Sequence, residues 1–295
     1  MKTKKDIHIL HSPVLANEVL SVLAPSRGET YLDLTAGYGG HARLVIKQTG
    51  NPSGSLLCDR DQFAVSYLSN HLPKGVQKLR ATFADVCRTL IEEGRRFDMI
   101  LADLGVSSPH LDNADRGFSI SKDGPLDMRM DQSSGRTAAE LINSASPAEL
   151  EMILRVFGEE PRARSITKAI IAARPLHTTS ELAAIIKKVY GTYTAHHPAT
   201  KSFQAIRIAI NDELGMLSEM LPLAVQLLKP KGRFAVITFH SLEDRIVKQF
   251  FKTEAAVGYD SSLIELTKKP ITATATDIRS NPRARSAKLR AVAKK

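Results

Sequence analysis

The stretch Thr30-Tyr-Leu-Asp-Leu-Thr-Ala-Gly-Tyr-Gly-Gly-His-Ala42 decides the fold. Its first half is a short apolar run of strand length that contains Asp33, and its second half is a glycine-rich loop. The helical pattern of Leu44, Val45 and Lys47 follows at once. This order of strand, loop and helix lets backbone amides at a helix N-terminus come close to a ligand. The stretch therefore predicts an α/β fold with a parallel sheet.

Three more apolar runs follow, and each leads to an acidic or aromatic side chain. They are residues 55–58 before Asp59, residues 76–81 before Phe83 and residues 99–102 before Asp103. Because ligands of open α/β sheets bind beyond the carboxyl ends of the strands, we expect these side chains to line one site. A carboxylate such as Asp59 can accept from both hydroxyls of a ribose, and Phe83 can stack on an adenine ring.

The loop Asp103-Leu-Gly-Val-Ser-Ser-Pro-His110 follows the last of these runs. The Asp103 carboxylate and the nearby backbone carbonyls are hydrogen-bond acceptors beside a turn whose flexibility Pro109 limits. Such acceptors suit the exocyclic amine of a nucleobase. We therefore predict Asp103, Ser108 and Pro109 as catalytic residues, although an Asp at the end of a strand also caps the next turn in many proteins.

Two cofactor classes fit this pattern. Gly37, Gly39 and Ala42 together with Asp59 match the dinucleotide fingerprint, so an NAD-dependent Rossmann oxidoreductase is one alternative. Asp33 favours S-adenosyl-L-methionine instead, because enzymes that use this cofactor need an acid in the first loop region for the methionine amine. The acceptors at the fourth strand point the same way, because methyltransferases that act on amino groups need them there.

Six blocks of sequence resemble the bacterial 16S ribosomal RNA cytosine-N4 methyltransferase family, known as RsmH or MraW. Within a span from about residue 12 to residue 290 they are Asp103–Pro109, Asp115–Ser119, Asp123–Asp131, His197–Arg207, Phe239–Lys248 and Asn281–Ser286. The resemblance implies a class I methyltransferase with a Rossmann-like, doubly wound sheet and an inserted all-helical substrate domain. It also implies methylation of the N4 amine of a decoding-centre cytidine, with S-adenosyl-L-methionine as cofactor.

The resemblance places the cofactor contacts at Gly39, Gly40, His41, Asp59, Phe83, Asp103 and His110. The residues themselves add Asp33 and Gly37 to this set. His110 departs from the family, which usually has Gln at this position, and a histidine lacks the paired donor and acceptor of an amide. We expect no metal and no disulfide, because Cys58 and Cys87 have no metal-ligand spacing and suit small core positions.

The middle of the chain changes from strand-like to helical patterns. Capping boxes predict helices that begin after Thr137, Ser146 and Thr178, and Gly158 and Gly191 stand where C-terminal caps belong. We therefore predict a discontinuous methyltransferase domain, residues 1–112 and 200–295, with an inserted helical domain for RNA or substrate recognition, residues 113–199.

Further along, the α/β pattern resumes. The spacing of apolar residues from Phe203 to Leu217 predicts one long amphipathic helix. Lys229–Gly232 reads as a turn, and residues 233–239 read as a buried strand. His240 follows that strand, where it could touch a nucleotide or belong to a helix cap.

Composition suggests the setting of the protein. Its 295 residues carry a formal net charge of +10, with a sequence pI near 9.6, which favours a polyanionic partner. The resemblance implies that this partner is 16S ribosomal RNA in the small ribosomal subunit. Seven Lys or Arg residues and no acid occur from Arg279 to Lys295.

No apolar stretch approaches the length of a membrane span, and Met1–Asp6 leads into no signal-peptide core. We expect a cytoplasmic protein without a membrane partner, and a homodimer stays open. The alternative from another class is a non-catalytic ribosome assembly factor on the same fold. The sequence keeps Gly37, Gly39, Asp59 and Asp103, which argues against a fold that has lost its catalytic activity.

Overall fold

A computed structural model describes residues 13–191, 197–256 and 261–295. Contacts between Cα atoms divide the chain into two compact units. The sheet unit comprises residues up to Gly105 and Leu214–Lys295, and the helical unit comprises Val106–Glu213. The predicted domain boundaries near residues 112 and 200 stay a prediction. In the described ranges, no helix is both long and apolar enough to cross a bilayer. The N-terminal segment without a signal-peptide core lies outside the described residues.

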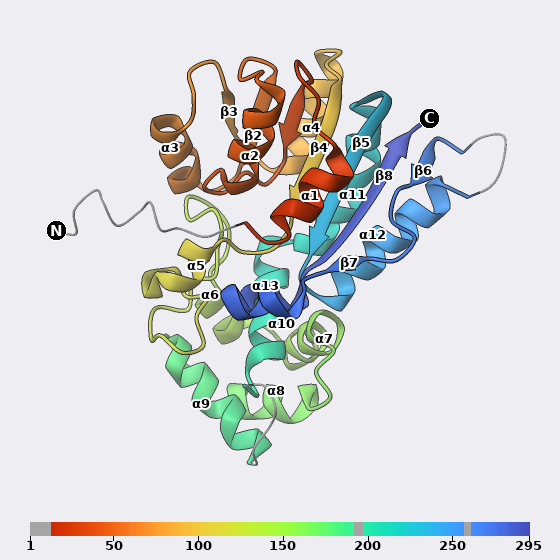
Figure 1. The fold of residues 1–295 in the computed structure, drawn as a ribbon. Helices are drawn as coiled ribbons and strands as arrows, with labels where there is room; N and C mark the ends of the chain where they lie inside the picture. The colour runs from red at the N-terminus through yellow and green to blue at the C-terminus, as the bar shows by residue number, and fades with distance from the viewer. Residues whose placement is uncertain (1–12, 192–196, 257–260) are drawn as a thin grey trace. The chain divides into compact units, whose positions relative to one another are not determined.

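The sheet unit is built on one mixed sheet in the order β3-β2-β1-β4-β5-β8-β6, and β7 also pairs with β8 (Figure 1). The strands are β1 (Tyr31–Asp33), β2 (Ser55–Asp59), β3 (Gln77–Arg80), β4 (Phe97–Asp103), β5 (Leu228–Thr238), β6 (Leu263–Glu265), β7 (Ile271–Thr272) and β8 (Lys288–Lys294). β1 to β5 pair in parallel, whereas β8 is antiparallel to β5, β6 and β7. The strand order reverses between β1 and β4, which is the switch point beside which such sheets bind ligands.

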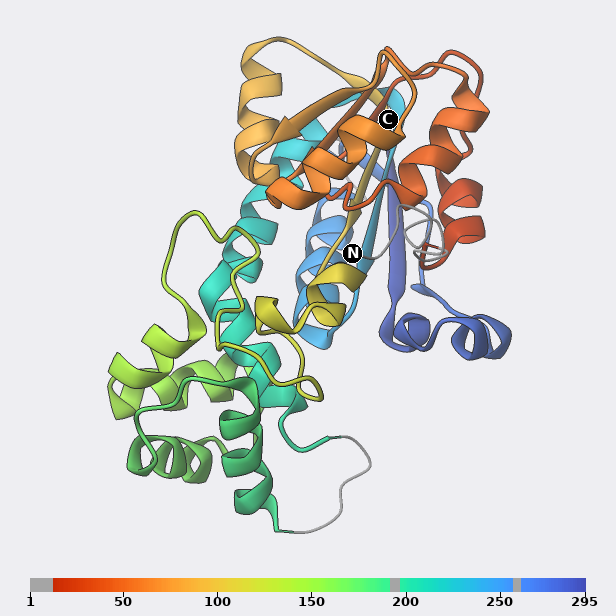
Figure 2. The ribbon, with the colours of Figure 1, turned by 90° about the vertical axis from the view of Figure 1, so that its left-hand side faces the viewer.

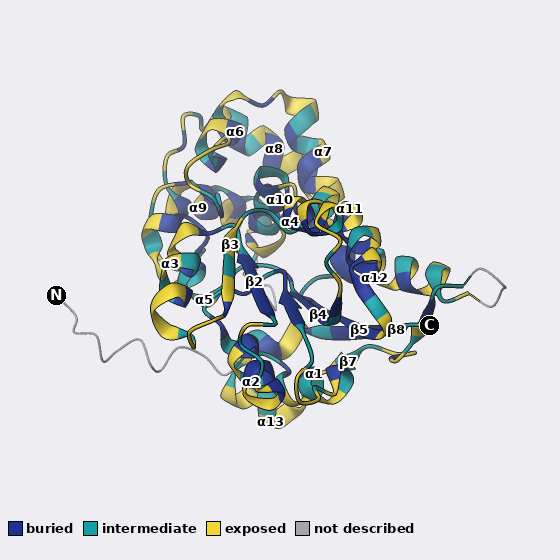
Figure 3. Ribbon diagram, turned by 90° about the horizontal axis from the view of Figure 1, so that it is seen from above, coloured by how far each residue is buried: buried dark blue, intermediate teal, exposed yellow. Residues whose placement is uncertain are grey.

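Two apolar cores cover the two faces of this sheet. Successive side chains of a strand point to opposite faces, so Leu32 joins one core and Tyr31 joins the other. Figure 3 shows the central strands as buried. The helices of this unit are α1 (Ala16–Leu23), α2 (Gly40–Thr49), α3 (Gln62–His71), α4 (Phe83–Glu92), α11 (Glu213–Gln226, of which Glu213 counts with the helical unit), α12 (Ser241–Glu254), α13 (Ala275–Ser280) and the 3₁₀ helix η3 (Pro282–Ser286). The doubly wound α/β prediction is confirmed, and Cys58 and Cys87 are both buried in a core.

Two local predictions for the chain after residue 199 are wrong. The expected long helix is two helices, α10 (Thr200–Asn211) and α11, because Asp212 adopts a left-handed conformation with φ 47° and ends the first. The expected turn at Lys229–Gly232 lies inside β5. There the register with β4 shifts between Phe97 and Met99, and Lys231 has φ 62°, so the extra residues form an irregularity within the strand.

The helical unit has its own apolar core. Its elements are α5 (Ser108–Asp112), the 3₁₀ helix η2 (Ala114–Arg116), α6 (Ala138–Ser144), α7 (Pro147–Gly158), α8 (Ala163–Ala172), α9 (Thr179–Tyr190) and α10. The green helices α7, α8 and α9 can be followed in Figure 2. The core gathers apolar side chains from all of the longer helices.

The predicted caps of these helices are mostly confirmed. Thr137 and Thr178 form full capping boxes, and Ser146 accepts from the Glu149 amide. Gly191 is a left-handed C-cap, as expected. Gly158 is not: it is the last residue of α7, and Glu159 takes the left-handed conformation. A Cβ at residue 158 would lie 2.7 Å from a backbone oxygen of α10, so close packing explains this glycine.

Candidate functional site

The sheet brings three carboxylates to one edge. β1 ends at Asp33, β2 ends at Asp59 and β4 ends at Asp103. Asp33 pairs in register with Leu57 on one side and Leu101 on the other, so Asp59 and Asp103 each stand two residues further along the sheet. The loop after β1 therefore starts between two carboxylates that are two strand spacings, about 10 Å, apart.

Hydrogen bonds tie this loop to both flanking strands. The Gly37 amide donates to Asp59 Oδ2 at 2.8 Å, and the Asp103 amide donates to Thr35 Oγ1 at 2.6 Å. Gly37 has φ 51° and Gly39 has φ 78°, conformations that glycine adopts without strain. A Cβ at Gly39 would also lie 2.9 Å from the Leu68 side chain. The loop is thus fixed between the two carboxylates, and a larger residue at position 39 would be strained by its positive φ.

Helix α2 begins directly after the loop, at Gly40. Its N-cap residue is Gly39, which has no side chain to accept from the amides of the first turn. Amides at a helix N-terminus attract anionic groups through their N–H donors and the helix dipole. The start of α2 can therefore hold a carboxylate of a ligand that also contacts the strand ends.

His41 and Asp103 leave polar atoms without partners. His41 Nε2 lies 3.6 Å from Asp103 Oδ2. Within the described part of the chain, neither His41 Nε2 nor Asp103 Oδ1 has a hydrogen-bond partner, although both atoms are buried. Burial lowers the pKa of His41 to about 4, so the ring is neutral at pH 7. Buried polar atoms without partners are costly, which makes this pair a place for a donor group of a ligand.

The carboxylates also influence one another. Asp33 is 2% exposed, and burial raises its pKa to about 7 against the opposing hydrogen bonds from Tyr31 and Thr35; the charge of Asp59 adds to the rise. Burial, followed by the charges of Asp33 and Glu243, raises the pKa of Asp103 well above its usual range. The Asp103 side chain nevertheless keeps 28% of its surface exposed, so a ligand can reach it. The edge therefore favours a ligand that brings positive charge.

The raised pKa of Asp33 makes folding stability depend on pH. Between about pH 4 and 7 the folded state keeps a proton that the unfolded chain loses, so the contribution of Asp33 to stability falls as the pH rises. Asp33→Asn removes this titration. We expect the stability of the variant relative to the natural chain to increase by about 1.4 kcal/mol for each pH unit between pH 4.5 and 6.5. Urea unfolding at several pH values measures it, and a difference that does not change with pH would contradict the shift.

The other predicted site residues lie as follows. Phe83 is the first residue of α4, half-buried beside a core cluster. Ser108, Pro109 and His110 belong to α5 in the helical unit, where His110 is 5% exposed and contacts Ser107 at the N-cap of that helix. The functional roles predicted for these four residues stay predictions.

Sequence reasoning missed three residues that contact the carboxylates or shift their pKa values. Thr35 Oγ1 accepts a hydrogen bond from the Asp103 amide, and the Tyr31 hydroxyl donates to Asp33 at 2.8 Å. The spacing of Tyr31 and Asp33 was a usable signal, because residues two apart in a strand share a face. Glu243 is the third, and it contributes to the raised pKa of Asp103. The Glu243 side chain is held in place by hydrogen bonds at the start of α12.

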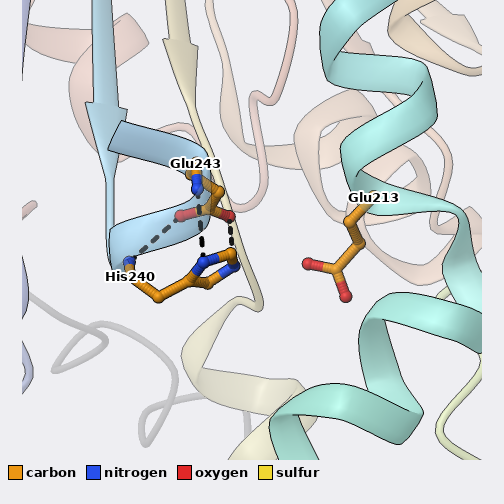
Figure 4. A group of neighbouring side chains, drawn as sticks. All are labelled: Glu213, His240 and Glu243. Carbon is orange, nitrogen blue, oxygen red and sulfur yellow. Dashed lines mark hydrogen bonds and ion pairs between the residues drawn. The ribbon is translucent and has the colours of Figure 1, made fainter. Parts of the chain in front are cut away.

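Figure 4 shows His240 and Glu243 at the start of α12. The Glu243 amide donates to His240 Nδ1 at 3.3 Å, and Glu243 Oε2 accepts from the amides of Phe239 and His240 at 2.7 and 3.3 Å. His240 is therefore the N-cap of α12 and fixes the Glu243 carboxylate. Glu213, also drawn, is the last residue of the helical unit and accepts from Arg207 at 2.8 and 2.9 Å.

Comparison with known proteins gives consistent matches over the whole length. The profile of the MraW methylase family matches residues 8–295. A protein of Syntrophotalea carbinolica named Ribosomal RNA small subunit methyltransferase H is 46% identical over 96% of this chain and 97% of its own length. Proteins with the same name from Cyanothece sp. and Nitratidesulfovibrio vulgaris are 47% and 44% identical over 95% and 96% of this chain, and over 93% and 85% of their own lengths. The chain therefore belongs to the MraW methylase family.

Proposed function

We propose that the protein is an S-adenosyl-L-methionine-dependent methyltransferase that methylates the N4 amine of a decoding-centre cytidine in 16S ribosomal RNA. The observation that carries the proposal is the edge of the sheet, where a glycine loop runs between Asp59 and Asp103 with Asp33 at its base. The names of the relatives support ribosomal RNA of the small subunit as the substrate. The setting we propose is the cytoplasm, and a homodimer stays a prediction.

The charge of the edge favours this cofactor over a nicotinamide dinucleotide. S-adenosylmethionine carries a sulfonium and an ammonium group, whereas the pyrophosphate of a dinucleotide carries two negative charges. Asp33 and Asp103 have raised pKa values because burial and neighbouring carboxylates disfavour their ionised forms. Positive charge in the site stabilises the ionised forms of both carboxylates, whereas a pyrophosphate would disfavour them further.

We assign the cofactor contacts by the chemistry of each group. Asp59 accepts from the ribose hydroxyls, and Phe83 stacks on the adenine. The amides of Gly39, Gly40 and His41 at the start of α2 hold the methionine carboxylate. Asp33 at the end of β1, together with Gly37 in the loop that follows, stabilises the positive charge of the methionine amine. Asp33 acts through its charge, because its oxygens already accept from Tyr31 and Thr35.

Asp103 is the acceptor for the target amine in this proposal. The lone pair of cytosine N4 is delocalised into the ring, so the nitrogen attacks poorly until an acceptor draws on its protons. A bound S-adenosylmethionine would supply an electrophilic methyl group, whose C–S bond would break as the N–C bond forms. Asp103 would hold the amine and could take the proton that the nitrogen loses. Alignment of nitrogen, carbon and sulfur at about 3 to 3.5 Å can supply roughly 7 to 11 kcal/mol, more than one hydrogen bond.

The proposal is tested with small ribosomal subunits that lack the modification. We expect the protein to transfer labelled methyl from S-adenosylmethionine to them, and mass spectrometry of the digested RNA to find the label on N4 of one cytidine. Label on adenosine or on protein would reject the assigned target. Failure to bind S-adenosylmethionine in calorimetry would instead favour the non-catalytic assembly factor.

A further inference from the structure

The positive charge of the protein is divided unequally between its two units. The helical unit contains thirteen Lys or Arg and thirteen Asp or Glu residues, so its formal charge is zero. The sheet unit contains 28 Lys or Arg and 18 Asp or Glu residues, which is the whole excess of +10. The net charge therefore attracts a polyanion to the sheet unit, and the recognition role predicted for residues 113–199 has no net charge behind it.

Most of that excess lies in the last 30 residues. Residues 266–295 hold nine Lys or Arg and a single acid, Asp277. Asp277 accepts from the backbone and hydroxyl of Thr274 in the capping box of α13. Two of the nine cations, Lys288 and Arg290, pair with Asp244. Asp244 offsets one of these two positive charges and holds both side chains within the fold.

Four of the remaining cations form what we call the C-terminal basic surface: Lys268, Lys269, Arg279 and Arg285. All four are exposed, and none forms an ion pair with an acid among the described residues. Figure 3 shows exposed residues along α13, which carries Arg279. Exposed cations without an acidic partner can neutralise the phosphates of a polyanion.

The register of the sheet places the segment that carries Arg279 and Arg285 at the edge that carries Asp103. Lys268 and Lys269 precede β7 and follow Thr267, which accepts from the Ala291 amide further along β8. Asp103 pairs with Ile237 of β5, and Ile237 pairs with Leu289 of β8. β8 begins at Lys288, opposite the last residue of β5, and β7 ends against the same Lys288. The segment between β7 and β8, with α13 and η3, therefore starts and ends at the carboxyl edge of the parallel strands. Its β8 end is two strand spacings, roughly 10 Å, from the strand of Asp103, and its β7 end is three strand spacings, roughly 14 Å, from it.

We propose that the C-terminal basic surface binds phosphates of the RNA strand that carries the target base. The inference rests on the proposed function and adds where the RNA backbone is held. A nucleotide whose base reaches Asp103 has neighbouring phosphates within one or two nucleotides, which matches the separation along the sheet edge. Phosphate contacts of this kind fix the position of the strand and carry no sequence information.

Two matched variants test the proposal. The first neutralises the C-terminal basic surface with Lys268→Gln, Lys269→Gln, Arg279→Gln and Arg285→Gln. The control neutralises four exposed cations of the helical unit, with Arg164→Gln, Lys168→Gln, Lys187→Gln and Lys188→Gln. Binding of fluorescently labelled 16S ribosomal RNA is measured at several KCl concentrations with S-adenosylhomocysteine present. Calorimetry of S-adenosylhomocysteine alone checks that each variant is folded.

We expect the slope of log affinity against log salt to fall by about 3 to 4 in the first variant, about 1 for each phosphate that is no longer neutralised. The control slope should change by less than about 1. In methylation assays the first variant should raise KM for small subunits and leave kcat unchanged, because only uniform binding is weakened. An unchanged slope in the first variant, or an equal decrease in the control, would overturn the inference and leave the proposed function standing. RNA binding that depends on these cations without methylation of cytidine would overturn the proposed function instead.

Discussion

Asp103→Ala should lower kcat for methyl transfer about a thousandfold at saturating cofactor and RNA. The Asp103 carboxylate stands at the end of β4 and has one buried oxygen without a partner among the described residues. An acceptor that draws on a proton in the transition state contributes about 10² to 10⁴ in rate. The substitution also removes the cofactor contact predicted for Asp103. We therefore expect the affinity for S-adenosylmethionine to fall about tenfold, in addition to the loss of turnover.

Two further variants separate chemistry from folding. Asp103→Asn keeps an acceptor oxygen and removes the charge, so its kcat should lie between those of the alanine variant and the natural chain. Asp98→Ala changes another carboxylate of β4, at the opposite edge of the sheet, where it accepts from Thr30 and Lys229. It should lower stability and leave kcat unchanged. Near-normal turnover by Asp103→Ala would remove this residue from the mechanism.

Asp59→Ala should weaken S-adenosylmethionine binding by about 10² to 10⁴, with a small effect on kcat once the cofactor saturates. Hydrogen bonds to a charged acceptor contribute about 1.5 to 3 kcal/mol each, and a ribose offers two. The same carboxylate accepts from the Gly37 amide at 2.8 Å, so the substitution also loosens the glycine loop. Both effects weaken binding, and isothermal titration calorimetry measures their sum.

Asp61→Asn is the matched control for Asp59. Asp61 lies two residues further on and caps α3 by accepting from the Phe63 amide at 2.9 Å. Asparagine keeps that cap and removes the charge, so the cofactor affinity should stay within about threefold. Cofactor binding by Asp59→Ala that equals the natural chain would show that the ribose is held elsewhere.

Much of the site could be predicted from the sequence because parallel sheets gather the carboxyl ends of their strands at one edge. The apolar runs that end in Asp59 and Asp103 were enough to place these carboxylates together, without knowledge of the strand order. The glycine-rich loop predicted that a helix begins directly after it, where α2 starts at Gly40. Capping boxes at Thr137 and Thr178 were equally direct, since the residue pattern itself makes the hydrogen bonds.

Other features depend on tertiary contacts that no local pattern records. Gly158 looked like a C-cap, yet close packing against α10 is what requires it. The break at Asp212 interrupts an apolar spacing that continues across it, so periodicity alone could not find it. The approach of His41 to Asp103 and the raised pKa values depend on burial. The neutral charge of the helical unit became visible only with the boundaries of the two units.

A crystal structure of the protein with S-adenosylhomocysteine tests the central claim most directly. We predict the ribose hydroxyls within hydrogen-bond distance of Asp59, the amino-acid carboxylate at the first turn of α2, and the sulfur facing Asp103. A ligand bound away from this edge, or one that leaves both Asp59 and Asp103 without contact, would contradict the account.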